Sequence, residues 1–414
     1  MTVTAAAVTM PQTAGRRAMS KKGKREPSRK LRVEFKRNRS SRTREKDWTQ
    51  RYRAGSESAE TSPESEDALQ GERISGKGDL VRKRTVVGSI LPTENASGER
   101  GDFRVLPDVS GKPTLPGRVV SVHGLYSRVE EEETGRIYTC ATRRILKTLS
   151  TEQRQVVIVG DRIRFRPASD DEGIIERIEP RFGSLSRTSR GRKHILVTNV
   201  DQALIVASAA EPAIKPNLID RLLVTCGRAG ITPVILVNKF DLADPPELMP
   251  LFGVYAQMGY KVIPTSTKTG YGIARVKRLL AGRESVVVGQ SGVGKSSLLN
   301  EIEPGLSLRT AEVSLENQKG RHTTTAAELL RLSFGGYVVD TPGIRQFMLW
   351  DIISEEVMAY FRDLCPYENL CKFSDCTHTH ENGCAVKDAV ADGRVDARRY
   401  ASYLSIRAGE MVDG

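Results

Sequence analysis

Short apolar runs separated by polar turns fill residues 117–180. The runs GRVVSVHGLYSRV, RIYTCATRRIL, VVIVGDRIRFRP and IIERIEP are rich in β-branched residues and are bounded by Gly or charged residues, a pattern typical of β-strands. Four or five strands in about 65 residues suit a small closed barrel such as the oligonucleotide-binding (OB) fold. We therefore expect an OB-fold barrel at 113–182, which either binds nucleic acid or serves only as packing.

From about residue 187 the pattern changes to apolar runs that alternate with amphipathic stretches. The runs VDQALIVASA, ITPVILVNKFD, YKVIPTST, ESVVVGQSG and GYVVDTPG each look like a buried parallel strand that ends in a polar or Gly-containing loop. Between them, NLIDRLLVTCGRAG and GIARVKRLLAG look like amphipathic helices. This alternation predicts a doubly wound α/β domain at 183–348, with ligands at the carboxyl ends of the strands.

The length and composition of the chain limit its class of protein. It has 414 residues, 38% of them hydrophobic, which leaves room for two or three domains. No run approaches the roughly 18 apolar residues of a membrane helix, and the first 20 residues lack the features of a secretory signal. We expect a cytoplasmic protein without a membrane partner, while an organellar address for a eukaryotic copy stays open.

The positive charge is concentrated near the N-terminus. The net charge is +13, and residues 16–53 carry 17 Lys plus Arg against 4 Asp plus Glu, so the rest of the chain is neutral overall. Such a segment has too little apolar surface to offset the entropy of ordering, and we expect 1–112 to be a disordered basic tail and linker. Its expected partner is a polyanion such as RNA. A solvated tail with no partner is the alternative.

A phosphate-binding loop follows the strand ESVVV. The sequence GQSGVGKS at 289–296 fits GxxxxGK[ST] and leads into the helical stretch SLLNEI. In such loops the backbone N–H groups surround the phosphates, the Lys reaches the β and γ oxygens, and the Ser hydroxyl faces Mg2+. A Gly-rich turn that binds nothing is the alternative. The expected nucleotide-binding residues are Gly289, Gln290, Ser291, Gly292, Val293, Gly294, Lys295, Ser296 and Ser297.

Two further loops indicate which base is bound. NKFD at 238–241 ends the strand PVILV, and the Asp241 carboxylate can accept hydrogen bonds from the N1–H and the N2 amine of guanine, whereas adenine presents the wrong pattern. Asn238 and the Lys239 stem would support the base and the loop. One strand later, three residues resemble the loop whose backbone binds the guanine O6 atom: Ser266, Thr267 and Lys268.

The order of the motifs is unusual. DTPG at 340–343 follows another apolar strand, which places Asp340 to hold Mg2+ through water and Gly343 to sense the γ-phosphate. NKFD and STK precede GQSGVGKS, whereas in ordinary GTPases the phosphate loop comes first. The same sheet is kept if the chain is cut and rejoined at other loops, so the order predicts a circularly permuted GTPase domain. The segment after Gly343, a nucleotide switch, then leads directly into the C-terminal region.

Four of the six cysteines fall in CPYENLCKFSDCTHTHENGC at 365–384. Cytosolic thiols stay reduced, and three sulfurs with one imidazole suit tetrahedral zinc, while a disulfide is the alternative. Four protein ligands leave no open position, so we expect one structural Zn2+ in a small, mainly α domain at 349–414. The following helix, DARRYASYLSIRAGE, either packs on this domain or contacts RNA. Cys365 and His380 are spare donors, and the expected ligands are Cys371, Cys376, His378 and Cys384.

The permuted motif order, the barrel before it and the Cys/His cluster after it resemble the RsgA family, the circularly permuted bacterial GTPases that mature the small ribosomal subunit. The resemblance covers about residues 113–400, and the spacing of the cysteine cluster matches the family's zinc knuckle. It implies a GTPase that hydrolyses GTP to GDP and phosphate, is stimulated by the small (30S) subunit, acts late in its assembly and binds rRNA. We expect it to be a monomer.

The resemblance also indicates the switch residues. Residues 320–325, GRHTTT, look like the family's first switch, in which a Thr hydroxyl completes the Mg2+ shell, with Thr324 the first choice and Thr323 the second. Ile344 stands where many GTPases carry a water-positioning Gln, so His322 is the candidate for orienting the attacking water; contact with RNA or solvent is its alternative. The expected catalytic residues are His322, Thr324 and Gly343, and the expected Mg2+ ligands are Ser296, Thr324 and Asp340.

Two other classes of protein stay open. A general RNA-binding protein or chaperone would use the nucleotide domain only as a structural module, which the complete NKFD, GKS and DTPG motifs argue against. An enzyme that phosphorylates or dephosphorylates a small metabolite would need a second substrate pocket. The guanine-reading loop and the basic tail argue against that enzyme.

Overall fold

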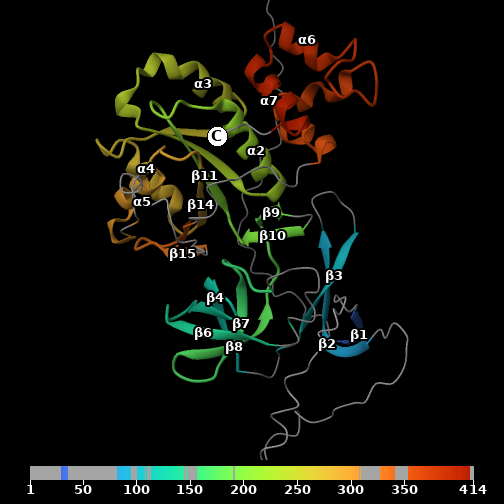
Figure 1. Cartoon of the computed structure of the whole chain (residues 1–414), viewed down its shortest axis with the longest axis vertical. Helices are drawn as coiled ribbons and strands as arrows, with labels where there is room; N and C mark the ends of the chain where they lie inside the picture. Colours follow the sequence, from blue (N-terminus) through green and yellow to red (C-terminus); the bar gives the residue numbers. More distant parts are fainter. Residues whose placement is uncertain are drawn as a thin grey trace, which may run out of the picture.

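A computed structural model describes the elements that carry most of these motifs (Figure 1). The described residues are 29–35, 82–94, 100–107, 109, 113–143, 146, 156–189, 192–306, 308, 327–340 and 353–410. They form a barrel, an α/β domain, a C-terminal module of short helices and a separate N-terminal sheet. None of the described helices combines the length and the apolar character that a membrane span requires.

The barrel is closed by five strands. They are β4 (Leu115–His123), β5 (Tyr126–Glu131), β6 (Ile137–Thr142), β7 (Arg162–Pro167) and β8 (Glu172–Ile178). The strands pair in the order β4-β5-β6-β8-β7, and β4 also pairs with β7, which closes the ring. Its interior is filled by apolar side chains such as Val119, Val129 and Phe165. The expected five-stranded barrel is therefore confirmed.

The α/β domain is built on six strands. In sequence order they are β11 (Gln202–Ser208), β12 (Thr232–Asn238), β13 (Lys261–Pro264), β14 (Glu284–Val288), β15 (Glu328–Arg331) and β16 (Tyr337–Asp340). They pair in the order β13-β12-β11-β14-β16-β15, and all the pairs are parallel except β15 with β16. The helices that connect them are α2 (Pro216–Ala229), α3 (Pro245–Gln257), α4 (Ile273–Leu280) and α5 (Lys295–Ile302).

Alternating side chains of the central strand pack on both layers of helices. Every residue of β11 is buried. Ile205 lies in the core with α2 and α3, whereas its neighbours Leu204 and Val206 lie in the core with α4 and α5. A parallel strand covered on both faces is largely apolar, which explains the unbroken run LIVA; the polar residues Gln202 and Ser208 lie at its two ends. The predicted doubly wound architecture is confirmed.

The barrel is joined to the nucleotide domain by strand pairing and by ion pairs. Glu328 of β15 pairs with Ser121 of β4, so one network of strands runs through both domains. At the start of β14, Glu284 is 4% exposed and accepts from Arg118 and Arg162 of the barrel, each at 3.0 Å. Burial raises the pKa of Glu284, and the two guanidinium groups oppose that shift. The hairpin β9 (Leu185–Ser189) and β10 (Arg192–Val197) lies between the domains in the chain.

The C-terminal module consists of short helices packed against α2. It contains η5 (Ser354–Glu356), η6 (Met358–Tyr360), η7 (Cys365–Leu370), α6 (Ala385–Ala391) and α7 (Ala397–Arg407). Figure 1 shows α7, in red, beside α2. Val224 of α2 belongs to the core of this module, together with Phe361 and Tyr403. The expected small, mainly helical domain is confirmed.

The N-terminal region differs from its prediction. Strands β1 (Arg29–Phe35), β2 (Arg82–Glu94) and β3 (Arg100–Pro107) form an antiparallel sheet within the segment expected to be a disordered tail and linker. The expectation rested on the high charge and the small apolar surface of the basic segment. In the sequence, however, Leu31, Val33 and Phe35 alternate with charged residues, and a period of two is the pattern of a strand. The rest of 1–112, apart from residue 109, lies outside the described residues.

Candidate functional site

The phosphate loop lies between strand β14 and helix α5. Gly289, Gly292 and Gly294 have φ values of +143°, +82° and +89°, a region that favours glycine. A Cβ atom on Gly289 would lie 2.1 Å from the Val206 carbonyl oxygen, so this turn also requires glycine for space. Helix α5 begins at Lys295 with no side-chain cap. The N–H groups of its first turn can therefore donate to an anion such as a phosphate.

Lys295 folds over this loop. Its Nζ donates to the carbonyl oxygens of Gly289 and Gln290, at 2.9 and 2.6 Å. The ammonium group therefore lies above the turn that the motif predicts will surround the phosphates. Ser296 and Ser297 follow in the first turn of α5 and are half-buried.

The NKFD loop, which the sequence predicts to read guanine, is attached directly to the phosphate loop. Asn238 ends β12 and is 1% exposed. Its Nδ2 donates to the Val293 carbonyl oxygen at 3.0 Å, and its Oδ1 accepts from Thr265 Oγ1 at 3.3 Å. A single amide side chain therefore connects three loops, two of which the sequence assigns to the base and one to the phosphates. Gly294 allows this approach, because a Cβ there would lie 2.5 Å from Asn238 Nδ2.

Asp241 is exposed in the short helix η2 (Phe240–Leu242). Its Oδ1 accepts from the hydroxyl of Ser266 at 2.6 Å, which fixes the carboxylate against the second base-reading loop. Thr267 is half-buried and Lys268 is exposed. The structure thus brings NKFD and STK together, as the sequence predicts for one guanine site.

Lys239 has a left-handed backbone, with φ of +59°. Its Nζ donates to the carbonyl oxygen of Glu211, in the loop that follows β11. Sequence reasoning missed Glu211 and the contact of Asn238 with Val293. The strand order explains these contacts. Because β11 lies between β12 and β14, its carboxyl end must adjoin both the NKFD loop and the phosphate loop.

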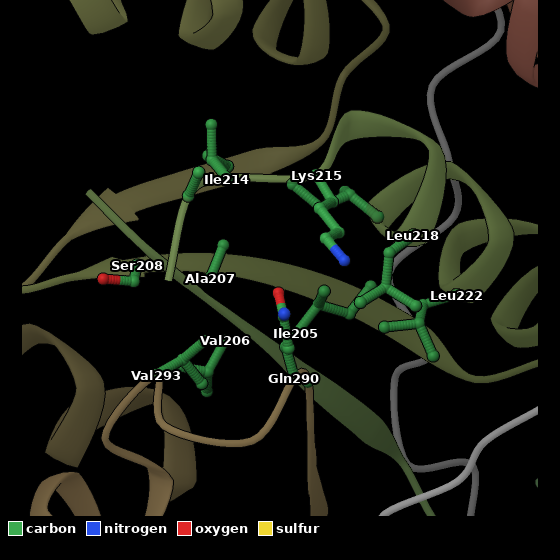
Figure 2. A pocket seen from close by; sticks show the side chains of 13 residues that line it. Ile205, Val206, Ala207, Ser208, Ile214, Lys215, Leu218, Leu222, Gln290 and Val293 are labelled. Carbon is green, nitrogen blue, oxygen red and sulfur yellow. The ribbon is translucent and has the colours of Figure 1, made fainter. Parts of the chain in front are cut away.

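A small hollow lies between the phosphate loop and α2 (Figure 2). The Lys215 ammonium and the Gln290 amide extend into it from opposite sides in the figure. Its volume is about 10 Å³, enough for about one water molecule, and Gly289, Gln290 and Val293 of the phosphate loop form part of its lining. Its apolar walls include Ile205, Leu218 and Leu222.

The switch residues are only partly described. Asp340 ends β16, next to β14, which is where a Mg2+-holding carboxylate is expected, but its side chain lies outside the described part. His322, Thr323, Thr324, Gly343 and Ile344 also lie outside the described residues. The expectations for these residues therefore stay predictions.

The predicted metal ligands converge in the C-terminal module. Among the described residues, Cys371, Cys376, His378 and Cys384 form a group whose ligand atoms all lie within 4.8 Å of one another. The Nδ1 atom of His378 is 3.4 Å from Cys371 Sγ and 3.5 Å from Cys384 Sγ, and these two sulfurs are 3.9 Å apart.

These separations fit a tetrahedral zinc ion. With Zn–S bonds of about 2.3 Å and Zn–N bonds of about 2.0–2.1 Å, tetrahedral ligands lie about 3.8 Å (S···S) and about 3.6 Å (S···N) apart. All six cysteines are free thiols, so the disulfide alternative is wrong for this structure. Cys365, the spare sulfur donor, is not part of the group.

Hydrogen bonds from outside the cluster hold its loop. The hydroxyls of Tyr400 and Tyr403, both on α7, donate to the carbonyl oxygens of His378 and Thr377, at 2.7 and 2.8 Å. Helix α7 therefore packs on the metal-binding loop, the first of the two roles expected for it. A hydrogen bond from the Thr377 hydroxyl is the main reason that the pKa of Glu381 lies well below its usual range. Backbone N–H groups of the loop also donate to this carboxylate and lower its pKa further.

A buried ion pair connects α7 to the nucleotide domain. Asp220 of α2 is fully buried, and its Oδ1 is 2.6 Å from Arg399 Nη1. Arg399 also donates to both carboxylate oxygens of Asp363, at 2.9 and 3.0 Å, and Tyr255 donates to Asp220 at 2.8 Å. Burial raises the pKa of Asp220, and the Arg399 guanidinium opposes that shift. The sequence offered no signal for this pair.

Comparisons with known proteins agree with this geometry. The family model of the RsgA GTPase matches residues 178–350. The small ribosomal subunit biogenesis GTPase RsgA of Moorella thermoacetica is 43% identical over 294 residues, which cover 71% of this chain and 97% of that protein. The protein of the same name from Thermotoga neapolitana is 41% identical over 293 residues, covering 70% and 95%.

Two solved structures are also similar. YjeQ from Thermotoga maritima has a TM-score of 0.60 and 37% identity, covering 71% of this chain and 98% of its own. YloQ, described as a circularly permuted GTPase, has a TM-score of 0.57 and 29% identity, covering 73% and 96%. The chain therefore belongs to the RsgA family of GTPases.

Proposed function

We propose that this chain hydrolyses GTP to GDP and phosphate as a late assembly factor of the small ribosomal subunit, and that the subunit stimulates the reaction. The observation that carries the proposal is the hydrogen bond from Asn238 Nδ2 to the Val293 carbonyl oxygen. This hydrogen bond holds the predicted guanine-reading loop next to the phosphate loop. A GTP site requires both loops side by side. The relatives from Moorella and Thermotoga are named for the biogenesis of that subunit.

In the proposed site, each group has a separate role. The Asp241 carboxylate accepts from guanine N1–H and N2, and the backbone of 266–268 donates to O6. The phosphate loop and Lys295 bind the phosphates through N–H groups and positive charge. The residues proposed to bind the nucleotide are Asn238, Lys239, Asp241, Ser266, Thr267, Lys268, Gly289, Gln290, Ser291, Gly292, Val293, Gly294, Lys295, Ser296, Ser297 and Asp340.

Hydrolysis requires groups that complete the site around the γ-phosphate. Ser296, Thr324 and Asp340 would hold Mg2+, which would neutralise charge on the phosphate oxygens. Gly343 senses the γ-phosphate, and His322 orients the attacking water. Replacing His322 by Ala should leave GTP binding intact and abolish the subunit-stimulated part of turnover. Unchanged stimulated turnover would contradict this role.

The remaining parts hold the protein on its partner. The barrel and the basic N-terminal segment bind rRNA by contacts to its phosphates, and the protein acts as a monomer in the cytoplasm. One structural Zn2+, held by Cys371, Cys376, His378 and Cys384, stabilises the C-terminal module. With four protein ligands it supplies no catalytic water.

The proposal is tested by GTP hydrolysis with purified protein alone, with small subunits and with large subunits, using ATP as the control substrate. We expect slow GTP turnover that rises only with small subunits, and little ATP turnover. If neither subunit stimulated turnover, the proposed partner, the small subunit, would be refuted. Equal turnover of ATP and GTP would refute the guanine site.

A further inference from the structure

Three aromatic rings form a stack behind the guanine-reading loops. Phe240, the third residue of NKFD, stacks with both Phe252 of α3 and Tyr271 in the loop before α4. The ring centroids of Phe240 and Tyr271 are 5.9 Å apart with an interplanar angle of 16°, and those of Phe240 and Phe252 are 6.3 Å apart at 27°. The outer ring, Tyr271, is 57% exposed. Its ring therefore contributes less to core burial than a buried aromatic residue does.

The stack joins the two loops that read the base. Phe240 directly precedes Asp241, and its backbone N–H donates to the Thr265 carbonyl oxygen at 3.1 Å. The Tyr271 carbonyl oxygen accepts from the Ser266 backbone N–H at 3.0 Å, which closes the loop around Thr267 and Lys268. Thus the ring contact links the NKFD loop to the O6-binding loop, in parallel with the hydrogen bond between Ser266 and Asp241.

The backbone beyond Tyr271 leaves little freedom. Gly272 has φ of +77°, and a Cβ on it would lie 2.3 Å from the Pro264 carbonyl oxygen. The Thr269 backbone N–H donates to Ser266 Oγ at 3.2 Å. The loop is therefore tightly closed, and the packing of Tyr271 on Phe240 adds to the Ser266–Asp241 hydrogen bond in fixing the loop relative to Asp241.

We propose that Phe240 and Tyr271 are positioning residues that set the selectivity of the site for guanine, an inference that rests on the proposed function. Neither side chain needs to touch the nucleotide. Their contact holds the Asp241 carboxylate and the 266–268 backbone at the spacing of the guanine edge. Without it, Asp241 loses its alignment with N1–H and N2, while the phosphate loop keeps its geometry.

The test compares GDP with IDP, whose hypoxanthine base lacks the N2 amine. Calorimetric titration of the full-length protein gives both dissociation constants for the natural chain and for Tyr271→Ala. An aromatic pair of this kind predicts about two- to tenfold weaker GDP binding. IDP binding should weaken less, so that the preference for GDP over IDP falls. Tyr271→Phe keeps the ring and should restore that preference.

Two further variants keep the test decisive. Met249→Ala removes a side chain on α3 that is 48% exposed and outside the stack, and it should bind both nucleotides as the natural chain does. Phe240→Leu keeps an apolar side chain but removes the ring contact, and it should reproduce the loss of preference even if Tyr271→Ala folds poorly.

Each other outcome has a distinct meaning. Equal weakening of GDP and IDP, or normal binding of both, would overturn the positioning role. Normal nucleotide binding with reduced stimulation by the small subunit would also overturn it and would make Tyr271 a contact for RNA. If the natural chain itself bound ADP as well as GDP, the proposed function would fail before any variant was made.

Discussion

At the scale of single residues, the proposed guanine site depends on a carboxylate held in place by a hydroxyl. Ser266 donates to Asp241 Oδ1 at 2.6 Å, so the carboxylate is held in one orientation before any nucleotide binds. Preorganisation of this kind reduces the entropy lost on binding. Selectivity should therefore respond sharply to the chemistry of residue 241.

Replacing Asp241 by Asn should invert the base preference. The amide cannot accept from both N1–H and N2, so GDP should bind about tenfold to a hundredfold more weakly. Its NH2 group can instead donate to O2 of xanthine, and XDP should bind better than it does to the natural chain. Titration with GDP and XDP gives both values, and unchanged GDP affinity would show that Asp241 does not read the base.

At the scale of elements, α7 begins with a charged cap. The Asp396 side chain accepts from the Arg398 backbone N–H at 2.8 Å. The Arg398 side chain also pairs with this carboxylate, and it is the main cause of a lowered pKa for Asp396. The cap fixes the start of the helix whose two tyrosines hold the metal-binding loop.

Asp396→Ala should destabilise the protein by about 0.5–2 kcal/mol at pH 7. Because the folded-state pKa lies below the ordinary value of 3.8, this contribution is present above about pH 4 and is lost as the pH falls through the folded pKa. Urea unfolding at several pH values checks both statements. Asp392→Ala, which removes an exposed ion pair with Arg394, should change the free energy of unfolding by less than about 1 kcal/mol.

The cysteine module should depend on metal. Analysis of the purified protein should give about one zinc per chain. Cys384→Ser should lose the metal, whereas Cys365→Ser, outside the four-ligand group, should keep it. Chelation should also unfold the module, since a small core of this kind relies on its metal. A module that stays folded without metal would contradict the structural role.

The elements differ in how far the sequence predicts them. Buried strands such as β11 and the Gly-rich phosphate loop have strong local patterns, and each was found. Helix α3 contains Pro250 and β15 has only four residues, so neither produced a clear period. The contacts of Arg399 and Tyr271 join segments far apart in the chain, and no local pattern encodes them. The switch residues were assigned by motif alone and stay predictions.

At the scale of the whole molecule, one helix faces two sites. The side chains of Leu218 and Leu222 line the hollow beside the phosphate loop, whereas Asp220 on the same helix, α2, pairs with Arg399 of α7. A displacement of α2 at the nucleotide site would therefore be transmitted to the cysteine module through a buried ion pair.

Replacing one member of the Asp220–Arg399 pair should strongly destabilise the folded protein. Arg399→Met leaves Asp220 buried without its partner, and we expect a loss of about 3–5 kcal/mol in the free energy of unfolding. The double variant with Asp220→Leu should be less destabilised than the sum of the two single variants. Arg394→Ala, whose side chain is 63% exposed, is the matched control and should have little effect. Additive single effects would show that the pair does not couple the two domains.

The bonds between the barrel and the nucleotide domain restrict how these domains can be exchanged between relatives. The barrel supplies Arg118 and Arg162, but the carboxylate that neutralises them, Glu284, starts the strand that leads to the phosphate loop. A chimaera that receives a foreign barrel would bury Glu284 without its cations unless both arginines came with it. In relatives, the paired residues at this junction should therefore change together. A foreign barrel should be tolerated only when it carries oppositely charged partners for Glu284, Glu328 and Arg331.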